Sequence, residues 1–247
     1  TATVTLEAVD MPSILAADTL TILEDAASSS GNVLTNDRDI DSPLKVASFT
    51  VNGTKVDVAS GGTPTSHTIT DVGTFTMLQT GAYTFKPAAN YNGSVPTITY
   101  KTNTGFESTL NITVTAVNDG PTAEAISLTT DEDTALRLNT TDFHFSDVDS
   151  GDTLRSVVIT SLPSSSKGYL QYKDDSGIWQ NVTLNQSISA DDIDAGRLQF
   201  KPALNTNGSL TFGFKVNDGT INSASSYTAT INVTAVNDDS VLTADTL

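Results

Sequence analysis

Apolar and polar residues alternate along two stretches that hold similar places in the two halves of the chain. Between residues 110 and 116, leucine, isoleucine, valine and alanine alternate with asparagine and threonine, and residues 229–235 show a similar order. A period of two puts the apolar side chains on one face of a β-strand, and threonine is frequent on exposed pleated surfaces. Each stretch is therefore expected to form a half-buried strand of an antiparallel sheet.

Turn signals separate such stretches. Asn52-Gly53, Gly61-Gly62 and Asp218-Gly219 are expected to connect strands, and Asp174-Asp175-Ser176-Gly177 is expected to form a hairpin turn before Trp179. Several short strands in each half of the chain are typical of a β-sandwich. No long amphipathic helix is expected.

One helical turn is expected at residues 189–193, with Ser189 as its N-cap. The acids of this segment, like Asp174 and Asp175, have no counterpart in the first half of the chain. They are interpreted as turn and cap residues: Asp191, Asp192 and Asp194.

Short motifs recur in the same order in both halves, which indicates an internal repeat. The recurring pairs are Glu24-Asp25 and Glu132-Asp133, Phe85-Lys86-Pro87 and Phe200-Lys201-Pro202, Asn92-Gly93-Ser94 and Asn207-Gly208-Ser209, and Ala116–Asp119 and Ala235–Asp238. The pattern predicts an all-β chain of two tandem Greek-key β-sandwich domains of the Ig or cadherin-like kind, in an extended arrangement.

The predicted domains are residues 14–119 and residues 120–238. Residues 1–13 are expected to be the final strand of a preceding repeat or a linker, and residues 239–247 the start of a following repeat. The chain would then be part of a longer array. A protein of only two units with frayed ends is the alternative.

The charge balance limits the partners. Of the 247 residues, 29 are acidic and 12 are basic, giving a net charge of −17. Such a chain repels phosphate backbones and anionic lipid surfaces, so we expect neither nucleic acid binding nor membrane insertion. Because the acids are clustered, they favour bound cations, although acidity that serves only solubility is the alternative.

The residue types exclude several kinds of site. The chain has no cysteine, which excludes thiol catalysis and iron–sulfur clusters. Its two histidines, His67 and His144, share no motif, so a catalytic triad or a histidine-rich metal site has little support.

Three kinds of acidic motif are candidates for Ca²⁺ binding: the Glu-Asp pair, the closing Asn-Asp pair, and a loop in which Asp37, Asp39 and Asp41 recur in the second half as Asp147, Asp149 and Asp152. Acids at alternate positions of a loop can turn several oxygens toward one point, and Ca²⁺ takes six to eight oxygen ligands. Solvated loops with Asx turns are the alternative. The candidate ligands are Glu24, Asp25, Asp37, Asp39, Asp41, Asn118, Asp119, Glu132, Asp133, Asp147, Asp149 and Asp152. Those from Asn118 to Asp152 are expected to converge where the two domains meet, so that an ion would stiffen the joint.

Four segments of the chain resemble two kinds of known repeat. The segment "EDAASSSGNVLTNDRDIDSPLKVASFTV" resembles the start of a VCBS repeat. The segments "EDTALRLNTTDFHFSDVDSGDTL", "ISADDIDAGRLQFKPALNTNGS" and "FKVNDGTINSASSYTATINVTAVND" resemble a bacterial cadherin-like tandem repeat. The resemblance implies an RTX-type adhesin of the bacterial cell surface, secreted by a type I system, whose repeats bind Ca²⁺ between domains.

The first repeat departs from this pattern in two places. Asp41-Ser42-Pro43 stands where Gly-Asp is usual, and "YKTNTGFES" stands where the second repeat has "FKVNDGTINS". If Asp218 is a metal ligand, the first repeat therefore has no equivalent ligand at this position.

The leading functional hypothesis is a Ca²⁺-stabilised extender that holds a distal binding region away from the cell, for surface attachment or biofilm formation. Its partners would be neighbouring repeats of the same chain. The alternative is a module that binds a sugar or peptide, with Tyr169, Tyr172, Trp179 and Tyr227 as candidates, although Trp179 is expected to pack on the sheet. An enzyme, such as a glycosidase with paired carboxylates, is not expected, because the carboxylates sit where ion sites would be.

Overall fold

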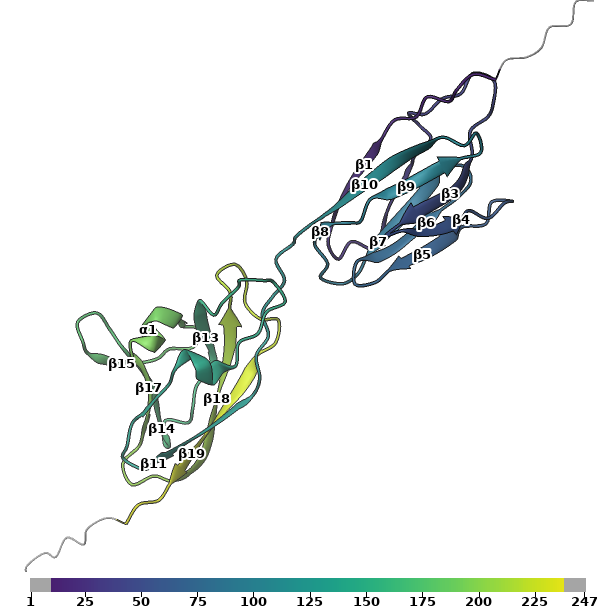
Figure 1. Ribbon diagram of the computed structural model, residues 1–247. Coiled ribbons are helices and arrows are strands. Elements are labelled where there is room, and N and C mark those ends of the chain that lie inside the picture. The colour runs from purple at the N-terminus through teal and green to yellow at the C-terminus, as the bar shows by residue number, and fades with distance from the viewer. Residues whose placement is uncertain (1–9, 238–247) are drawn as a thin grey trace, which may run out of the picture. The chain divides into compact units, whose positions relative to one another are not determined.

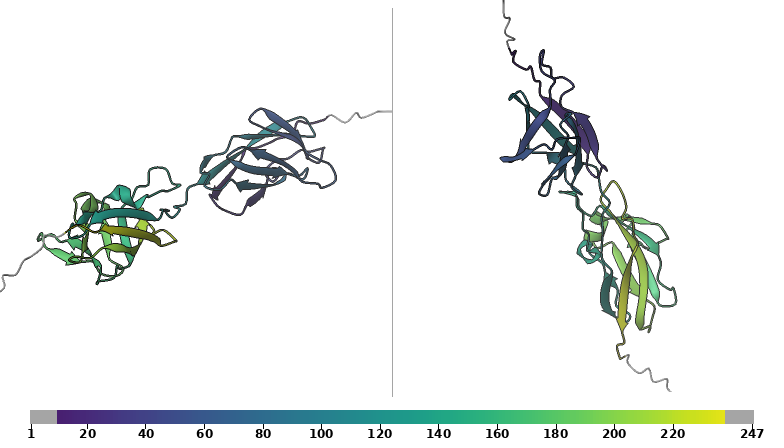
Figure 2. Two further views of the ribbon diagram at one scale, coloured as in Figure 1. Left: turned by 90° about the horizontal axis from the view of Figure 1, so that it is seen from below. Right: turned by 90° about the vertical axis from the view of Figure 1, so that its right-hand side faces the viewer.

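The computed structural model describes residues 10–237, and these form two compact units whose border falls between Val117 and Asn118. Each unit is a β-sandwich with its own hydrophobic core (Figures 1 and 2). Residues 1–9 of the predicted first segment (residues 1–13), residue 238 of the second predicted domain and the whole predicted last segment (residues 239–247) lie outside the described residues. Among residues 10–237, the structure contains no helix with the length and apolar character that a membrane crossing requires.

Unit 1 stacks two sheets. Its strands are β1 (Asp18–Leu23), β2 (Ser29–Asn32), β3 (Val46–Val51), β4 (Thr54–Asp57), β5 (Thr65–Ile69), β6 (Gly73–Met77), β7 (Ala82–Pro87), β8 (Gly93–Ser94), β9 (Ile98–Thr102) and β10 (Glu107–Thr115). One sheet has the order β1-β10-β9-β3-β4, with β8 also paired to β10, and the other has the order β2-β7-β6-β5.

Unit 2 repeats this plan. Its elements are β11 (Ile126–Asp131), β12 (Leu136–Arg137), η1 (Thr140–Phe143), β13 (Ser156–Ser161), β14 (Gly168–Lys173), β15 (Trp179–Asn181), β16 (Ser187–Ser189), α1 (Ala190–Asp194), β17 (Leu198–Pro202), β18 (Gly208–Asn217) and β19 (Tyr227–Thr234). The sheets have the orders β11-β19-β18-β13-β16 and β12-β17-β14-β15. The predicted all-β fold is confirmed.

In each unit the first strand pairs in parallel with the last. β1 runs beside β10 from Asp18↔Leu110 to Leu23↔Thr115, and β11 runs beside β19 from Ile126↔Ala229 to Asp131↔Thr234. All the other strand pairs are antiparallel within the described residues. The chain therefore begins each unit at one end of the sandwich and leaves it at the other.

The predicted alternation is present in β10 and β19. Leu110, Ile112 and Val114 are buried in unit 1, as are the corresponding apolar residues of β19. Ala116 and Ala235, predicted to continue this alternation, instead follow the strands and are exposed. The alternation therefore identified the buried face correctly but placed the end of each strand too late.

The repeated Phe-Lys-Pro motif meets a glycine on the neighbouring strand in both units. Gly73 begins β6 with φ 154°, and Gly168 begins β14 with φ 147°. A Cβ atom on Gly73 would lie 2.4 Å from the carbonyl oxygen of Lys86, and one on Gly168 would lie 2.5 Å from that of Lys201. Only glycine permits this close approach of two strands.

The short helix and its cap follow the sequence-based prediction. α1 spans Ala190–Asp194, and the Ser189 side chain accepts a hydrogen bond of 3.1 Å from the backbone N–H of Asp192. The Asp192 carboxylate also accepts hydrogen bonds from Tyr172 and Arg197. Asp192 thus lies in the first turn of the capped helix, and Asp174 accepts the N–H of Ile178 within its own turn, as predicted for these two residues.

Truncation of a side chain in one hydrophobic core should lower the stability of that unit alone. Phe214 is fully buried and packs edge-on against Phe143, with ring centroids 5.1 Å apart. We expect Phe214→Ala to cost unit 2 about 3–5 kcal/mol of unfolding free energy and to lower only one of two calorimetric transitions. Phe75→Ala, in the core of unit 1, should lower the other. Equal shifts of both transitions in either variant would contradict separate cores.

Candidate metal centre

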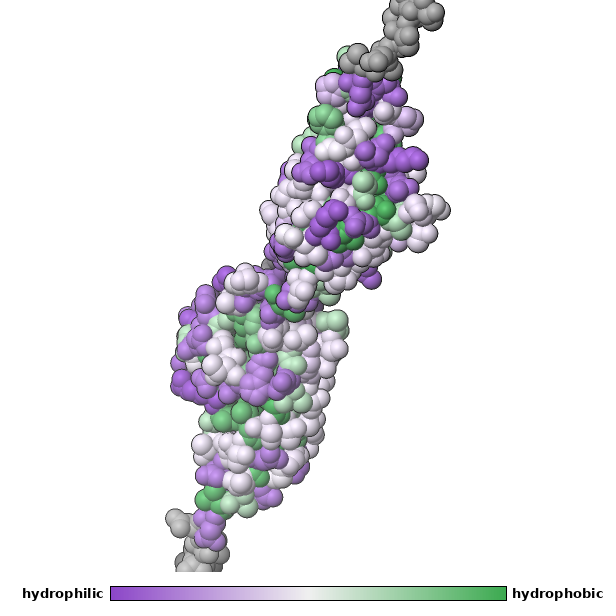
Figure 3. Space-filling model, turned by 45° about the vertical axis from the view of Figure 1, so that its right-hand side comes forward, coloured by the Kyte–Doolittle hydropathy of each residue, from purple (hydrophilic) through white to green (hydrophobic). Residues whose placement is uncertain are grey.

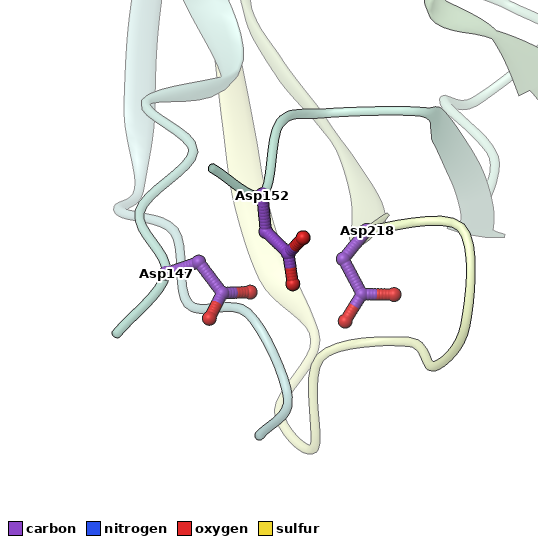
Figure 4. Close-up of side chains that lie close together, drawn as sticks. All are labelled: Asp147, Asp152 and Asp218. Atoms are coloured by element: carbon purple, nitrogen blue, oxygen red, sulfur yellow. The ribbon is translucent and has the colours of Figure 1, made fainter. Parts of the chain in front are cut away.

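Three aspartates from two loops converge at the N-terminal end of unit 2, the end at which the chain begins this unit. Asp147 and Asp152 lie on the loop between η1 and β13, and Asp218 follows the last residue of β18. Figure 4 shows the three side chains close together. One oxygen from each lies within 4.8 Å of the others, and we call this group the aspartate triad.

The spacing fits one cation. Two oxygens on opposite sides of a Ca²⁺ ion are separated by about 4.6–5.2 Å, since each Ca–O distance is about 2.3–2.6 Å. The triad oxygens fall within this limit. Carboxylates bound to one ion can therefore have this spacing without a large movement of the loops.

Backbone donors fix Asp218 in its turn. Its Oδ1 accepts hydrogen bonds from the N–H groups of Thr220 (2.6 Å) and Ile221 (2.7 Å). The side chain is buried, with 7% exposed. Burial raises the pKa of Asp218, but hydrogen bonds from these donors and from Asn118 lower it by more, so that the net shift is downward. Asp218 thus contributes a buried negative charge to the triad.

Asp147 has one satisfied and one unsatisfied oxygen. Its Oδ1 accepts a 3.0 Å hydrogen bond from the N–H of Asp149. Its Oδ2 is buried and has no hydrogen-bond partner among the described residues. A buried carboxylate oxygen without a partner carries a desolvation penalty, which a bound cation would relieve.

Asp152 shows the electrostatic cost of the cluster. Burial, followed by the charges of Asp147, Asp149 and Asp218, raises the pKa of Asp152, and Arg155 opposes the shift only in part. The negative form of Asp152 is therefore disfavoured by its neighbours. A divalent cation would reverse this balance.

The first residues of unit 2 are tied to the same end. The Asn118 side chain donates a 3.0 Å hydrogen bond to Asp218 Oδ2, and the N–H of Asp119 donates a 2.7 Å hydrogen bond to Asp149 Oδ2. Asn118, Asp119, Asp147, Asp149 and Asp152 are thus grouped as predicted. Their loops hold the chain where it begins the unit.

Glu132 and Asp133 do not join this group, so the predicted convergence is wrong for these two residues. Glu132 follows β11, and its Oε1 accepts a 2.8 Å hydrogen bond from the N–H of Val236, just beyond β19. Asp218 precedes the N-terminal end of β19, and the eight residues of this strand span about 25 Å. The first strand carries Glu132 to the C-terminal end of the unit, away from the triad.

Unit 1 contains the same arrangement at its C-terminal end. Glu24 is buried, with 3% exposed, and accepts hydrogen bonds from the N–H of Val117 and the side chain of Asn92. Asp25 and Asp133 both have positive φ, 59° and 61°, and both accept a backbone N–H bond in equivalent turns. Each Glu-Asp motif therefore fastens the chain where it leaves a unit.

The aspartates of the first loop are engaged with protein donors. Asp37 accepts hydrogen bonds from the Tyr100 hydroxyl (2.6 Å) and the N–H of Ala16 (2.8 Å). Asp39 accepts from the Ser13 hydroxyl (2.5 Å), and Asp41 from the N–H of Met11 (2.9 Å). The three acids thus stabilise the first segment of unit 1.

Hydrogen bonds correct the pairing of the two loops. The N–H of Asp41 donates to Asp39 as that of Asp149 donates to Asp147, and Asp41 accepts from Met11 as Asp149 accepts from Asp119. Asp39 and Asp41 therefore correspond to Asp147 and Asp149. The spacing of acids had indicated that Asp37 corresponds to Asp147, and this is wrong. Asp37 instead accepts a hydrogen bond from the Tyr100 hydroxyl.

The sequence-based set of ligands omitted Asp218. The signal was the turn Asn217-Asp218-Gly219, which unit 1 replaces with Asn103-Thr104-Gly105. Thr104 shares a hydrogen bond of 2.6 Å with the Ser13 hydroxyl. A hydroxyl network in unit 1 thus occupies the place that the triad occupies in unit 2.

Comparison with known proteins identifies the type of domain. A family model described as bacterial Ig domain matches residues 10–116 and again residues 118–234. No curated protein matches the chain.

Several solved structures are similar. They include domains EC1-2 of human protocadherin-24 (14% identity, 88% of this chain, 93% of that chain, TM-score 0.48). They also include the human desmocollin-1 ectodomain (13% identity, 92% of this chain, 39% of that chain, TM-score 0.40). A third is an endo-fucoidan hydrolase of glycoside hydrolase family 107 (20% identity, 90% of this chain, 28% of that chain, TM-score 0.28). The chain spans well under half the length of the last two, and similarities this weak say nothing about what it binds.

Asp39 provides a test of pH dependence in unit 1. The hydrogen bond from Ser13, with backbone donors from Asp41 and Ser42, lowers the pKa of Asp39 from 3.8 to about 2. Its stabilising contribution is therefore present above the unfolded pKa and is lost as the pH falls through about 2. Ser13→Ala should raise the pKa of Asp39 in a carboxyl ¹³C NMR titration and move acid unfolding of unit 1 to higher pH.

Ser66→Ala is the matched control, because the Ser66 hydroxyl bonds to Thr76 and to no carboxylate in the described residues. An unchanged pKa of Asp39 in Ser13→Ala would contradict the account of this loop.

Proposed function

Because the chain belongs to the bacterial Ig domain family, we propose that it is a Ca²⁺-stabilised spacer segment of a bacterial cell-surface adhesin. In this role the repeats hold a distal binding region away from the cell for attachment or biofilm formation. The segment is extracellular and has no catalytic role. Its partners are neighbouring repeats of its own chain.

The parallel pairing of the first and last strands is the observation that carries the spacer proposal. Six residue pairs join β11 to β19, and six join β1 to β10. Tension applied to the two ends of a unit loads the hydrogen bonds of this pair together, in shear, so that they must break at once. Such a pair resists force better than one that opens bond by bond from an end.

Side chains reinforce this strand pair. Glu132 is buried, with 7% exposed, and bonds to the N–H of Val236 immediately after β19. At the other end of unit 2, Asn118 and Asp119 are fastened to Asp218 and Asp149. Both points at which a pulling force reaches the unit are therefore anchored by carboxylates.

Ca²⁺ is the cation that best fits the triad. The ligands are hard carboxylate oxygens, and the triad contains no histidine or cysteine that would favour zinc. Mg²⁺ keeps more of its own water and is bound by fewer protein ligands. The net charge of −17 adds a general attraction for divalent cations.

The ion would join two loops that already hold the start of unit 2. One loop carries Asp147 and Asp152, and the turn after β18 carries Asp218, which bonds to Asn118. A bound ion would lock these loops together and neutralise their repulsion. Unit 1 has Thr104 in place of Asp218, so the proposed stabilisation is confined to unit 2.

Calorimetry with and without Ca²⁺ tests the metal site. At about 100 times its Kd, a ligand stabilises the folded state by about 2.7 kcal/mol, or roughly 10 °C for a domain of this size. We expect this shift in the transition of unit 2 and none in that of unit 1. Chelation with EDTA should reverse the shift. No shift of unit 2 would contradict the proposal.

Asp152→Asn should produce opposite effects in the two conditions. In EDTA the variant should melt above the wild type, because it removes a charge that Asp147, Asp149 and Asp218 repel. In Ca²⁺ it should melt below the wild type, because a ligand is lost. Asp175→Asn is the matched control, since Asp175 has a 95% exposed side chain paired with Arg197, outside the triad. Equal Ca²⁺ shifts in Asp152→Asn and Asp175→Asn would exclude the triad as the site.

Single-molecule pulling tests the spacer role. Both units should unfold in separate high-force events, because each is loaded through a parallel strand pair. Ca²⁺ should raise the unfolding force of unit 2 only, and Asp152→Asn should remove that increase. Low-force, gradual extension of the wild-type chain in Ca²⁺ would contradict the proposed role.

A further inference from the structure

The outer face of one sheet of unit 2 carries large polar and aromatic side chains. In β14, Leu170 points into the core, so Tyr169, Gln171 and Lys173 share the outward face. Gln171 lies opposite Asn181 on β15, and Tyr169 lies opposite Lys201 on β17. Figure 1 shows these strands at one side of unit 2.

Part of this face is hollowed. A pocket of about 760 Å³ opens over it, with Tyr169 and Leu204 among its apolar lining residues and Asp133, Gln171, Asn181 and Lys201 as its polar ones. Tyr169 is 42% exposed and Leu204 is 80% exposed. On the face drawn in Figure 3, hydrophobic residues form groups among residues of intermediate and hydrophilic character. The pocket therefore combines exposed apolar surface with polar groups.

The polar groups are pre-positioned. Gln199 donates a 3.1 Å hydrogen bond to Gln171, and Gln171 donates one of 3.1 Å to Asn181. This row of amides is anchored at the buried Gln199, with 7% exposed, and reaches solvent at Asn181. Amides held in this way can donate to and accept from a ligand with little further loss of side-chain freedom.

Unit 1 shows that the fold does not require these residues. Because Gly73 and Gly168 are equivalent, Thr74 and Thr76 of unit 1 hold the places of Tyr169 and Gln171. The corresponding pocket, which Thr74 lines, has a volume of only about 230 Å³. The aromatic and amide side chains are thus a specific addition to unit 2.

We propose that this face of unit 2 binds a neutral oligosaccharide. The exposed ring of Tyr169 offers a flat apolar surface to the C–H face of a pyranose, and Leu204 adds a second apolar contact. Gln171, Asn181, Lys201 and Asp133 supply the donors and acceptors that sugar hydroxyl groups need. Because the pocket contains one lysine and one aspartate, its charges favour a neutral sugar over a sulfated or carboxylated one.

The other aromatic candidates are engaged elsewhere. The Tyr172 hydroxyl donates to Asp192, and Tyr227 packs against Phe214 with centroids 5.9 Å apart. Trp179 lies on the same outer face as Tyr169, with the Lys173 ammonium 5.8 Å from its ring centroid. As the single tryptophan of the chain, Trp179 provides a fluorescence probe beside the site.

The experiment is a fluorescence titration of the whole chain in Ca²⁺ with cellohexaose, xylohexaose, laminarihexaose and mannohexaose, and with heparin as the anionic probe. We expect a saturable change of Trp179 fluorescence with at least one neutral sugar, at concentrations up to about 10 mM. Tyr169→Thr and Gln171→Thr, which install the residues of unit 1, should each weaken that binding about tenfold or more.

Phe106→Thr is the matched control, because Phe106 is an aromatic residue of unit 1 with the same 42% exposure. It should bind as the wild type does, and a thermal melt of each variant confirms that it is folded. No saturable response to any neutral sugar would overturn the proposal. Neutral-sugar binding of the same strength in Tyr169→Thr and in the wild type would overturn it too, as would heparin binding that Tyr169→Thr weakens.

Discussion

The repulsion among carboxylates at the N-terminal end of unit 2 is the interaction that links its metal site to the anchoring of the chain. Asp147, Asp152 and Asp218 place oxygens within 4.8 Å of one another, and one oxygen of Asp147 is buried without a hydrogen-bond partner. Such a group is costly without a counter-ion and stabilising with one. The loops that carry it also hold the first residues of the unit, so their stability and the anchoring of the chain are linked.

The opposite end of each sandwich solves a similar problem without an ion. Glu24 and Glu132 are buried, and each accepts a hydrogen bond from the N–H of a valine just beyond the last strand of its unit. A backbone donor therefore compensates at least part of the cost of burying each carboxylate. The acidic motifs of this chain thus have two distinct physical roles, which their composition alone does not separate.

Much of the fold could be predicted from the sequence, because alternation, turn residues and the repeated motifs are local signals. Leu110, Ile112 and Val114 are buried as the period of two requires, and Ser189 caps its helix. The site was only partly predictable, because it depends on which end of a strand a residue reaches. Glu132 follows β11 and lies far from Asp147, whereas Asp218 arrives from a distant turn. The spacing of acids likewise matched Asp37 to Asp147, although Asp37 serves Tyr100.

A crystal structure of the chain grown in Ca²⁺, with the ion located by its anomalous scattering, would show whether the aspartate triad holds a metal ion. We expect one Ca²⁺ bound by Asp147, Asp152 and Asp218, with Ca–O distances of about 2.3–2.6 Å. We also expect Asp39 and Asp41 to keep their hydrogen bonds to Ser13 and Met11. An aspartate triad that binds only water, or an ion bound to Asp39 and Asp41 instead, would refute the proposed metal site.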